Sequence, residues 1–321
     1  MKKIAVLADY LEPSHHALIN STAARCGFAV DYYPDCRVPA ELAGTYEVVH
    51  GMPKPGDLKA FTGMKWFCGS FAGVDAYLDD ALYPSPEVML SNSSGTYGVT
   101  IAEHLIMVTL MLLRHAPAYL HHADAHRWGP VMPMRSIIGS TITVLGTGDI
   151  GTEFARRAKA MGAKAIRGVR RTKKAADPAF DGVFTHAELD SLLPDTDILV
   201  MALPSTADTV GILSRDRIAL LPETAYVINV GRGTAIDQSA LVEALNAGKL
   251  AGAALDVFEK EPIPAGDPVW DAKNLLITPH ISGQMSLGYT RDKNVALFCE
   301  DLENYAAGRP LKRYVDRKIG Y

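Results

Sequence analysis

The sequence predicts an α/β protein with two doubly wound parallel-sheet domains. Short apolar or β-branched runs alternate with segments of helical period, which is typical of βαβ units. The length of 321 residues exceeds what one ordinary hydrophobic core holds together, so two domains are expected. A G-x-G-x-x-G motif stands between an apolar run and a helical segment, which indicates a Rossmann-type dinucleotide-binding domain in the second half.

The first domain is predicted to begin with a strand and a helix. Residues 3–8 are apolar and β-branched, and the helical segment 14–27 opens on a serine and closes on a glycine. Further strands are expected at 28–33, 46–50, 64–68 and 88–92. A polar, glycine-containing stretch at 91–95 separates these strands from a long apolar helix at 99–114, so the domain break is expected near 92–98.

The second domain is predicted to hold a complete dinucleotide-binding sheet. Six strands are expected, at 141–146, 165–169, 198–203, 226–230, 252–257 and 275–279. Helices are patterned most clearly at 150–162 and 238–249. A last helix is expected at about 287–307, because Gly308 and Pro310 follow it and stop it.

Composition and charge indicate a soluble globular protein. Hydrophobic residues make up 48% of the chain and charged residues 21%, and the formal net charge of −4 offers no overall attraction to nucleic acid or anionic lipid. The four cysteines are scattered without a CxxC pair or zinc-ligand spacing, so we expect reduced thiols and no metal. The longest apolar run, 105–113, is about half a membrane span, and the N-terminal apolar run is too short for a signal peptide. We therefore expect a cytoplasmic protein without membrane or nucleic-acid partners.

The motif VLGTGDIG, residues 144–151, predicts a phosphate-binding loop. Gly146 permits the tight turn, Gly148 lets the backbone approach a pyrophosphate, and Gly151 lets the helix pack close to the sheet. The helix N-terminus adds N–H groups and the positive end of its dipole. A glycine-rich turn of an unrelated α/β protein is the alternative, which the strand–turn–helix context disfavours. Asp149 competes with phosphate for the same dipole, so we expect its side chain to face solvent.

The turn after the next strand decides which dinucleotide binds. An NAD site carries Asp or Glu there, which accepts hydrogen bonds from the ribose hydroxyls. Here the strand leaves as GVRRTKK, residues 168–174, and the first acid is Asp177. A guanidinium of Arg170 or Arg171, with the hydroxyl of Thr172, suits a 2′-phosphate, so NADP is expected in preference to NAD. The alternative is a solvated basic surface run.

Three consecutive strands of the second domain are predicted to end in polar groups at one edge of the sheet. Arg232 follows the fourth strand, Glu259 and Glu261 follow the fifth, and His280 follows the sixth. Open α/β sheets bind ligands at this edge. Beside a nicotinamide, such groups can anchor a carboxylate, polarise a carbonyl and deliver a proton while hydride arrives. Taken singly, each has a plainer interpretation as a cap, an exposed turn residue or a loop histidine.

In these motifs and their order, the chain resembles the D-isomer-specific 2-hydroxyacid dehydrogenases along essentially its whole length. The resemblance is carried by GSFAGVDAYL (69–78), VTIAEHLIMVTLMLLR (99–114), the phosphate loop, ALPSTADTVGIL (202–213), NVGRGTAIDQSALVEAL (229–245), GAALDVFEKEP (252–262), ITPHISG (277–283) and the closing ENYAAGRPLKRYVD. It implies a Rossmann-type cofactor domain, 97–285, inserted into a smaller flavodoxin-like substrate-binding domain, 1–96 plus 286–321. It also implies a homodimer formed through the cofactor domain and its apolar helix.

The resemblance implies catalytic roles for Arg232, Glu261 and His280. His280 is the general acid in reduction and the base in oxidation. Glu261 precedes a proline as the family's catalytic Glu does, so it bonds the imidazole and favours its protonated form, while Glu259 is a bystander. Arg232 binds the carbonyl oxygen and a carboxylate oxygen of a 2-oxo acid. Both Arg232 and His280 thus contact the substrate.

The phosphate-loop motif and the resemblance together assign the remaining binding residues. For the cofactor these are Gly146, Thr147, Gly148, Asp149, Ile150, Gly151, Arg170, Arg171, Thr172, Leu203, Pro204, Thr209, Val230, Asp256 and Thr100. The resemblance implies that Asp256 accepts a bond from the nicotinamide amide and that Thr100 lies near the nicotinamide. It also implies that the backbone near Ala72 and Gly73 holds the substrate carboxylate.

Three hypotheses remain open for the function. The first is NADPH-dependent reduction of a small 2-oxo acid, of the glyoxylate or hydroxypyruvate type, to the D-2-hydroxy acid. The second is a phosphoglycerate dehydrogenase-like enzyme, which needs further basic groups for the substrate phosphate. The third is a dinucleotide-sensing, corepressor-like binding protein, which the intact Arg232, Glu261 and His280 disfavour. Outside these motifs, His104 is expected in the core or an interface, and Trp128 is expected in side-chain packing or within reach of an active site.

Overall fold

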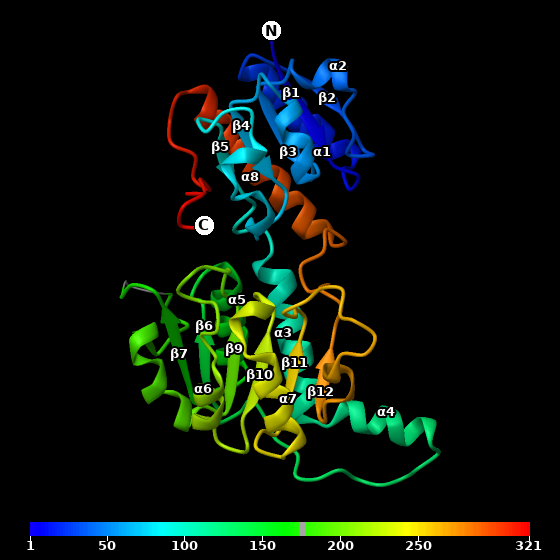
Figure 1. Ribbon diagram of the computed structural model, residues 1–321, viewed down its shortest axis with the longest axis vertical. Coiled ribbons are helices and arrows are strands. Elements are labelled where there is room, and N and C mark those ends of the chain that lie inside the picture. The colour runs from blue at the N-terminus through cyan, green and yellow to red at the C-terminus, as the bar shows by residue number, and fades with distance from the viewer. Residues whose placement is uncertain (174–176) are drawn as a thin grey trace. The chain divides into compact units, whose positions relative to one another are not determined.

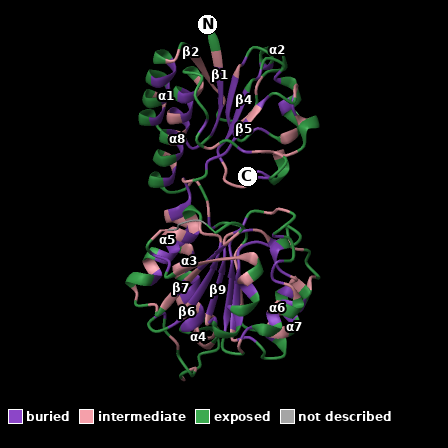
Figure 2. Cartoon of the chain, turned by 90° about the vertical axis from the view of Figure 1, so that its left-hand side faces the viewer, coloured by how far each residue is buried: buried purple, intermediate pink, exposed green. Residues whose placement is uncertain are grey.

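The computed structural model describes residues 1–173 and 177–321, which form two compact units. The N-terminal unit comprises Met1–Tyr97 with Gln284–Tyr321, and the central unit comprises Gly98–Gly283. In each unit, helices flank a parallel sheet (Figure 1). Figure 2 shows that the central strands of both sheets are buried while the helices expose their outer faces. The predicted fold class, with two parallel-sheet α/β domains, is confirmed.

The N-terminal unit is built on a five-stranded parallel sheet of order β2-β1-β3-β4-β5. Its strands and helices are β1 (Lys2–Leu7), α1 (Pro13–Arg25), β2 (Phe28–Tyr32), α2 (Ala40–Ala43), β3 (Val48–Gly51), β4 (Trp66–Gly69), β5 (Met89–Ser91) and α8 (Gly288–Ala306). Although α8 comes last in the chain, its buried Phe298 stacks on His50 with 4.0 Å between ring centroids, in the same core as Trp66. Burial lowers the pKa of His50 to about 4, which keeps the stacked imidazole neutral.

The central unit is built on a seven-stranded parallel sheet of order β12-β11-β10-β9-β6-β7-β8. Its strands and helices are α3 (Gly98–Leu113), α4 (Ala116–Asp124), β6 (Thr141–Leu145), α5 (Asp149–Ala160), β7 (Ala165–Arg170), β8 (Gly182–Thr185), β9 (Ile198–Met201), α6 (Arg215–Leu220), β10 (Tyr226–Asn229), α7 (Gln238–Asn246), β11 (Gly252–Leu255) and β12 (Leu275–Ile277). The connections between successive parallel strands pass over the faces of the sheet, as a doubly wound fold requires.

The prediction of six strands in this sheet was wrong, because β8 adds a seventh. Its four residues, GVFT, are all half-buried, and they pair on one side only, with β7. An edge strand this short lacks the continuous apolar run by which a central parallel strand is recognised. Helices α4 and α6 were also not predicted. Trp128, which was expected to pack, is fully exposed in the segment after α4.

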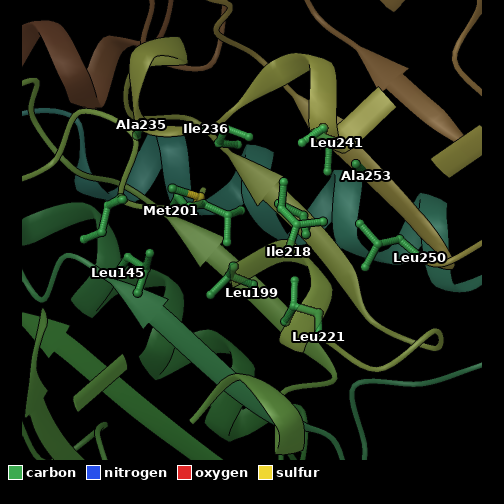
Figure 3. Packing of buried hydrophobic residues seen from close by; sticks show 14 of the residues in the cluster. Leu145, Leu199, Met201, Ile218, Leu221, Ala235, Ile236, Leu241, Leu250 and Ala253 are labelled. Carbon is green, nitrogen blue, oxygen red and sulfur yellow. The ribbon is translucent and has the colours of Figure 1, made fainter. Parts of the chain in front are cut away.

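One hydrophobic core of the central unit lies between the middle strands and the helices α6 and α7 on one face of the sheet. Figure 3 shows Leu145, Leu199 and Met201 from the strands packed with Ile218 and Leu241 from α6 and α7. All four residues of β9, β10 and β11 are buried, as expected for strands covered on both faces. This packing fixes the positions from which the chain leaves each strand.

No single described helix is long and apolar enough to span a membrane; α3 and α4 together reach that length and composition, but they are bent by 64°. Among the described residues, no three His, Cys, Asp or Glu side chains gather in a group that could hold a metal ion. The four cysteines are free thiols.

Candidate active site

The predicted catalytic residues lie at the carboxyl ends of β10, β11 and β12 in the central sheet. The three strands are parallel, and their last residues stand side by side in register. The chain leaves β10 toward Arg232, β11 toward Asp256 and β12 toward His280. Polar groups from three neighbouring strands therefore emerge at the edge where open α/β sheets bind ligands.

The phosphate loop between β6 and α5 has the geometry that its glycines predict. Gly146 has a φ of +102°, and a Cβ there would lie 2.6 Å from the carbonyl oxygen of Ala202. A Cβ on Gly151 would lie 1.9 Å from the carbonyl oxygen of Gly146, which is too close for any side chain. A Cβ on Gly148, by contrast, meets no atom of the described residues within 4 Å. The loop is therefore packed on the protein side and open at Gly148, which fits a pyrophosphate above the N-terminus of α5.

Asp149, the first residue of α5, is exposed as expected, but its carboxylate lies against Gly98, the first residue of α3. A Cβ on Gly98 would lie 2.4 Å from Oδ1 and 2.6 Å from Oδ2 of Asp149. A carboxylate at this position is stabilised by the positive end of the α3 dipole. Asp149 thus interacts with a second helix, which reduces its competition with phosphate. Thr100 lies in the same first turn of α3 and is half-buried.

The turn after β7, which was predicted to recognise the ribose, presents basic groups. Arg170 ends β7 and is half-buried, and Arg171 and the next residue are exposed. The first carboxylate after the turn, Asp177, accepts a hydrogen bond from the guanidinium of Arg156, which lowers the pKa of Asp177. This pairing engages the acid that could otherwise bond ribose hydroxyls. Lys174, which belongs to the same basic run, lies outside the described residues.

The residues predicted to line the nucleotide follow β9 and β10. Leu203 and Val230 are buried, whereas Pro204 is exposed. The buried hydroxyl of Thr209 donates to the carbonyl oxygen of Pro204 over 2.6 Å and accepts from the N–H of Thr206 over 2.8 Å. Thr209 therefore closes this loop with its own hydrogen bonds and gives it a fixed shape.

Arg232 stands between two glycines because the backbone packs closely on both sides of it. A Cβ on Gly231 would lie 2.6 Å from a carbonyl oxygen of the β9 loop, and one on Gly233 would lie 2.0 Å from the carbonyl oxygen of Phe258. The side chain of Asn229 holds the turn: its Nδ2 donates to the Arg232 carbonyl (2.9 Å) and its Oδ1 accepts from the Gly231 N–H (3.0 Å). The half-buried Arg232 is thus carried on a rigid strand exit.

Glu261 and His280 meet directly. The Nδ1 atom of His280 lies 2.7 Å from Oε2 of Glu261, and the other carboxylate oxygen accepts from the N–H of Phe258 over 2.8 Å. Because a carboxylate only accepts, Nδ1 carries the hydrogen, which fixes the tautomer of the imidazole. Glu259 is occupied elsewhere, since it exchanges hydrogen bonds of 3.1 and 3.2 Å with Gln238 at the start of α7.

The buried carboxylate of Asp256 holds the loop that carries His280. It accepts from the hydroxyl of Thr278 (2.6 Å) and from the N–H groups of Ile281 (3.0 Å) and Ser282 (3.0 Å). Its own carbonyl accepts from the N–H of His280 over 2.9 Å. Burial alone would raise the pKa of Asp256, but these hydrogen bonds outweigh it and leave the pKa lowered. No local sequence pattern indicates this supporting role, because the role depends on contacts between the loops that follow two different strands.

His104 extends this group of contacts. It lies half-buried on α3 with Nε2 3.4 Å from the hydroxyl oxygen of Thr278, and burial lowers its pKa. His104 was expected in the core or an interface, and its proximity to the His280 loop was not predicted. A histidine on an otherwise apolar helix face, together with a Thr two residues before His280, was the available signal.

Ala72 and Gly73 lie in the loop after β4 in the N-terminal unit, and both are half-buried. The carbonyl of Ala72 accepts from Nδ2 of Asn92 over 2.7 Å, and that of Phe71 accepts from the N–H of Ser93 over 2.9 Å. The carbonyl groups of this loop are therefore directed into the unit.

Comparison with known proteins agrees with this geometry. The family model described as "D-isomer specific 2-hydroxyacid dehydrogenase, NAD binding domain" matches residues 106–282. Glyoxylate/hydroxypyruvate reductase A from Klebsiella pneumoniae (strain 342) is 32% identical over 257 residues, which cover 78% of this chain and 80% of that protein. D-3-phosphoglycerate dehydrogenase from Archaeoglobus fulgidus is 30% identical over 239 residues, covering 71% of this chain and 43% of that protein.

Solved structures resemble the chain over its whole length. A D-isomer specific 2-hydroxyacid dehydrogenase from Xanthobacter autotrophicus Py2, in complex with NADPH and MES, has a TM-score of 0.82 and 28% identity, covering 100% of this chain and 99% of that one. An NADPH-dependent glyoxylate/hydroxypyruvate reductase from Sinorhizobium meliloti, in complex with NADP and sulfate, has a TM-score of 0.82 and 27% identity, covering 100% of both chains.

Replacing Asp256 by Asn tests the support of the His280 loop. The amide replaces one carboxylate oxygen by a donor, which then faces at least one of the three groups that donate to Asp256. We therefore expect a loss of about 1–3 kcal/mol in the free energy of unfolding, measured in urea at pH 7. The lowered pKa adds a pH signature: stability from this carboxylate is present above its unfolded pKa of about 3.9 and is lost as the pH falls through the folded value. The exposed Asp208→Asn is the control, and equal curves for both variants would refute the role.

Proposed function

The chain belongs to the family of D-isomer specific 2-hydroxyacid dehydrogenases, and we propose that it reduces a small 2-oxo acid of the glyoxylate or hydroxypyruvate type to the D-2-hydroxy acid with NADPH. The family is one of NAD(P)-dependent oxidoreductases. The observation that carries the proposal is the 2.7 Å contact between Glu261 and His280 at a strand edge shared with Arg232.

The side chains supply a proton and a fixed charge. NADPH, held by the loop 146–151 and the turn after β7, would supply the hydride for C2 of the 2-oxo acid. Nε2 of His280 gives a proton to the carbonyl oxygen, so that hydride and proton together reduce C=O to CH–OH. Glu261 stabilises the imidazolium before this transfer and keeps the ring oriented. Arg232 polarises the carbonyl and binds one carboxylate oxygen. Backbone N–H groups near Ala72 and Gly73 are proposed to bind a carboxylate oxygen of the substrate.

The proposed preference for NADP rests on the positive charge of the turn after β7, residues 170–173, which is called the ribose turn. Arg170 and Arg171 offer guanidinium groups with Thr172 beside them, and Asp177 is engaged by Arg156. A 2′-phosphate gains charge-assisted hydrogen bonds in such a turn, whereas NADH gains none of them. Two structural relatives were solved with NADPH or NADP bound, which supports the assignment.

The chain is further proposed to form a homodimer through the central unit. Helix α4 and the segment after it extend away from the sheet of this unit (Figure 1). This segment exposes Leu120, Trp128, Met132 and Ile138, a set of large apolar side chains that a second copy would cover. Most apolar side chains of α3 are already buried within the central unit. The exposed apolar side chains of α4 and of the segment after it are therefore proposed to enlarge the dimer interface that was expected on α3.

Activity with NADPH and a panel of 2-oxo acids tests the reaction. Glyoxylate, hydroxypyruvate, pyruvate and 3-phosphohydroxypyruvate are compared by the loss of nicotinamide absorbance. We expect the first two to give the highest kcat/KM. His280→Ala should lower kcat by about 10²–10⁴-fold while the Kd for NADPH stays within about twofold, because proton transfer is lost and cofactor binding is not. Turnover of none of the acids would favour a dinucleotide-sensing protein, and loss of NADPH binding in His280→Ala would refute its assigned role.

The role of the ribose turn is tested by measuring the affinity of Arg170→Ala and Arg171→Ala for NADPH and for NADH. Arg170→Ala and Arg171→Ala remove charge-assisted bonds to the 2′-phosphate, so at least one variant should weaken NADPH binding by about 10–100-fold and leave NADH binding nearly unchanged. Lys164→Ala, which removes an exposed cation before β7, is the control. Equal affinity of the unchanged protein for NADH and NADPH would contradict the proposed preference.

Sedimentation at micromolar concentration tests the dimer. A mass of twice the 34.6 kDa chain is expected. Trp128→Ser combined with Leu120→Lys should weaken association at least tenfold by removing buried apolar area and adding a charge. Leu18→Lys, on α1 of the N-terminal unit, should have no such effect. A monomer at all concentrations would rule out the proposal.

A further inference from the structure

The peptide between Gly69 and Ser70, where the chain leaves β4, forms part of a buried ring of hydrogen bonds. The hydroxyl of Tyr10 lies 2.7 Å from Oγ of Ser70 and 2.8 Å from Oδ1 of Asn294. Nδ2 of Asn294 donates to Oγ of Ser93 over 2.7 Å, and that hydroxyl donates to the carbonyl oxygen of Gly69 over 2.8 Å. All four side chains are at least nine-tenths buried.

Donors and acceptors in this ring follow one consistent order. The carbonyl oxygen of the Asn294 side chain only accepts, so the single hydroxyl hydrogen of Tyr10 is donated to it. The Tyr10 oxygen then accepts the hydrogen of Ser70. On the other side, Ser93 accepts from the Asn294 amide and donates its hydrogen to the backbone. The hydroxyls of Tyr10 and Ser93 each donate one hydrogen bond and accept another, so removal of either hydroxyl leaves buried partners unsatisfied.

The ring is part of a wider set of contacts that bonds four consecutive carbonyl groups inside the unit. The donors are Ser93 Oγ to Gly69, the Tyr97 hydroxyl to Ser70 (2.5 Å), Ser93 N–H to Phe71 (2.9 Å) and Asn92 Nδ2 to Ala72 (2.7 Å). These peptides are trans, and in a trans peptide the C=O and N–H groups point in opposite directions. Because the carbonyls of Phe71 and Ala72 point inward, the N–H groups of Ala72 and Gly73 point away from the interior.

We propose that Tyr10 and Asn294 are positioning residues that direct the Ala72 and Gly73 N–H groups toward the substrate carboxylate. This inference rests on the proposed function, which assigns carboxylate binding to that loop. Two outward N–H groups in succession suit one carboxylate, and the neutral ring behind them holds their direction without adding charge. Asn294 belongs to α8, so the last helix of the chain supports a loop that lies more than 200 positions earlier in the sequence.

Tyr10→Phe and Ser93→Ala each delete one hydroxyl of the ring and test this inference. The carboxylate keeps its charge throughout the reaction, so loosening its binding loop weakens ground state and transition state alike. We expect KM for glyoxylate to rise about tenfold, with kcat and the Kd for NADPH within about twofold. The Kd of oxamate for the NADPH complex, measured by calorimetry, should rise by the same factor.

Tyr46→Phe is the matched control. It also removes a buried tyrosine hydroxyl from this unit, one bonded to Asp31 at 2.9 Å. Tyr46 precedes β3, however, so it lies at the end of the strands opposite to the one where β4 leads into Ser70. Its KM should stay unchanged while its stability falls. Unchanged KM in both ring variants, or equal shifts in Tyr46→Phe, would overturn the inference while leaving the proposed function standing. Failure of the unmodified protein to reduce any 2-oxo acid would instead refute the function itself.

Discussion

The candidate site depends on one constraint, the set of hydrogen bonds that the buried carboxylate of Asp256 receives from the loop after β12. The strand pairing of β11 and β12 brings the two loops together, but pairing alone leaves the backbone beyond the strands undetermined. Three donors from the His280 loop converge on one carboxylate, which lies at the end of β11. His280 itself has a φ of 53°, a conformation that non-glycine residues seldom adopt, so its loop needs such external support.

Close backbone packing is the second constraint, and it explains the glycines on either side of Arg232. Neither glycine has a positive φ in this structure; both are required because a Cβ would collide with the backbone of a neighbouring loop. The same packing brings the Arg232 turn against Phe258, whose N–H binds Glu261. The turn that carries Arg232 is therefore linked through Phe258 to Glu261, and through Glu261 to His280. A shift of the chain where it leaves one of these strands would change the positions of the other two groups.

The phosphate loop and the central strands could be predicted from the sequence, because the patterns that indicate them are local. The strand–glycine loop–helix order marked the phosphate loop, and buried runs such as ILVM and YVIN marked the central strands. The seventh strand escaped prediction because GVFT, at an edge, carries neither alternation nor a long apolar run. The contributions of Asp256, His104 and Asn294 escaped it for another reason. Each acts through partners distant in the sequence, and no local pattern records such a pairing.

The two units use different physical means to prepare a site, and this difference has a consequence for pH. Around the loop after β4, the ring consists of hydroxyl and amide groups, and burial raises the pKa of Tyr10 further above its ordinary value. None of these groups changes charge near neutral pH, so the direction of the Ala72 and Gly73 N–H groups is independent of pH there. In the central unit, function is proposed to require a protonated imidazole beside a carboxylate. The carboxylate-binding loop therefore depends on neutral hydrogen bonds, whereas the proposed proton transfer depends on the contact between His280 and Glu261.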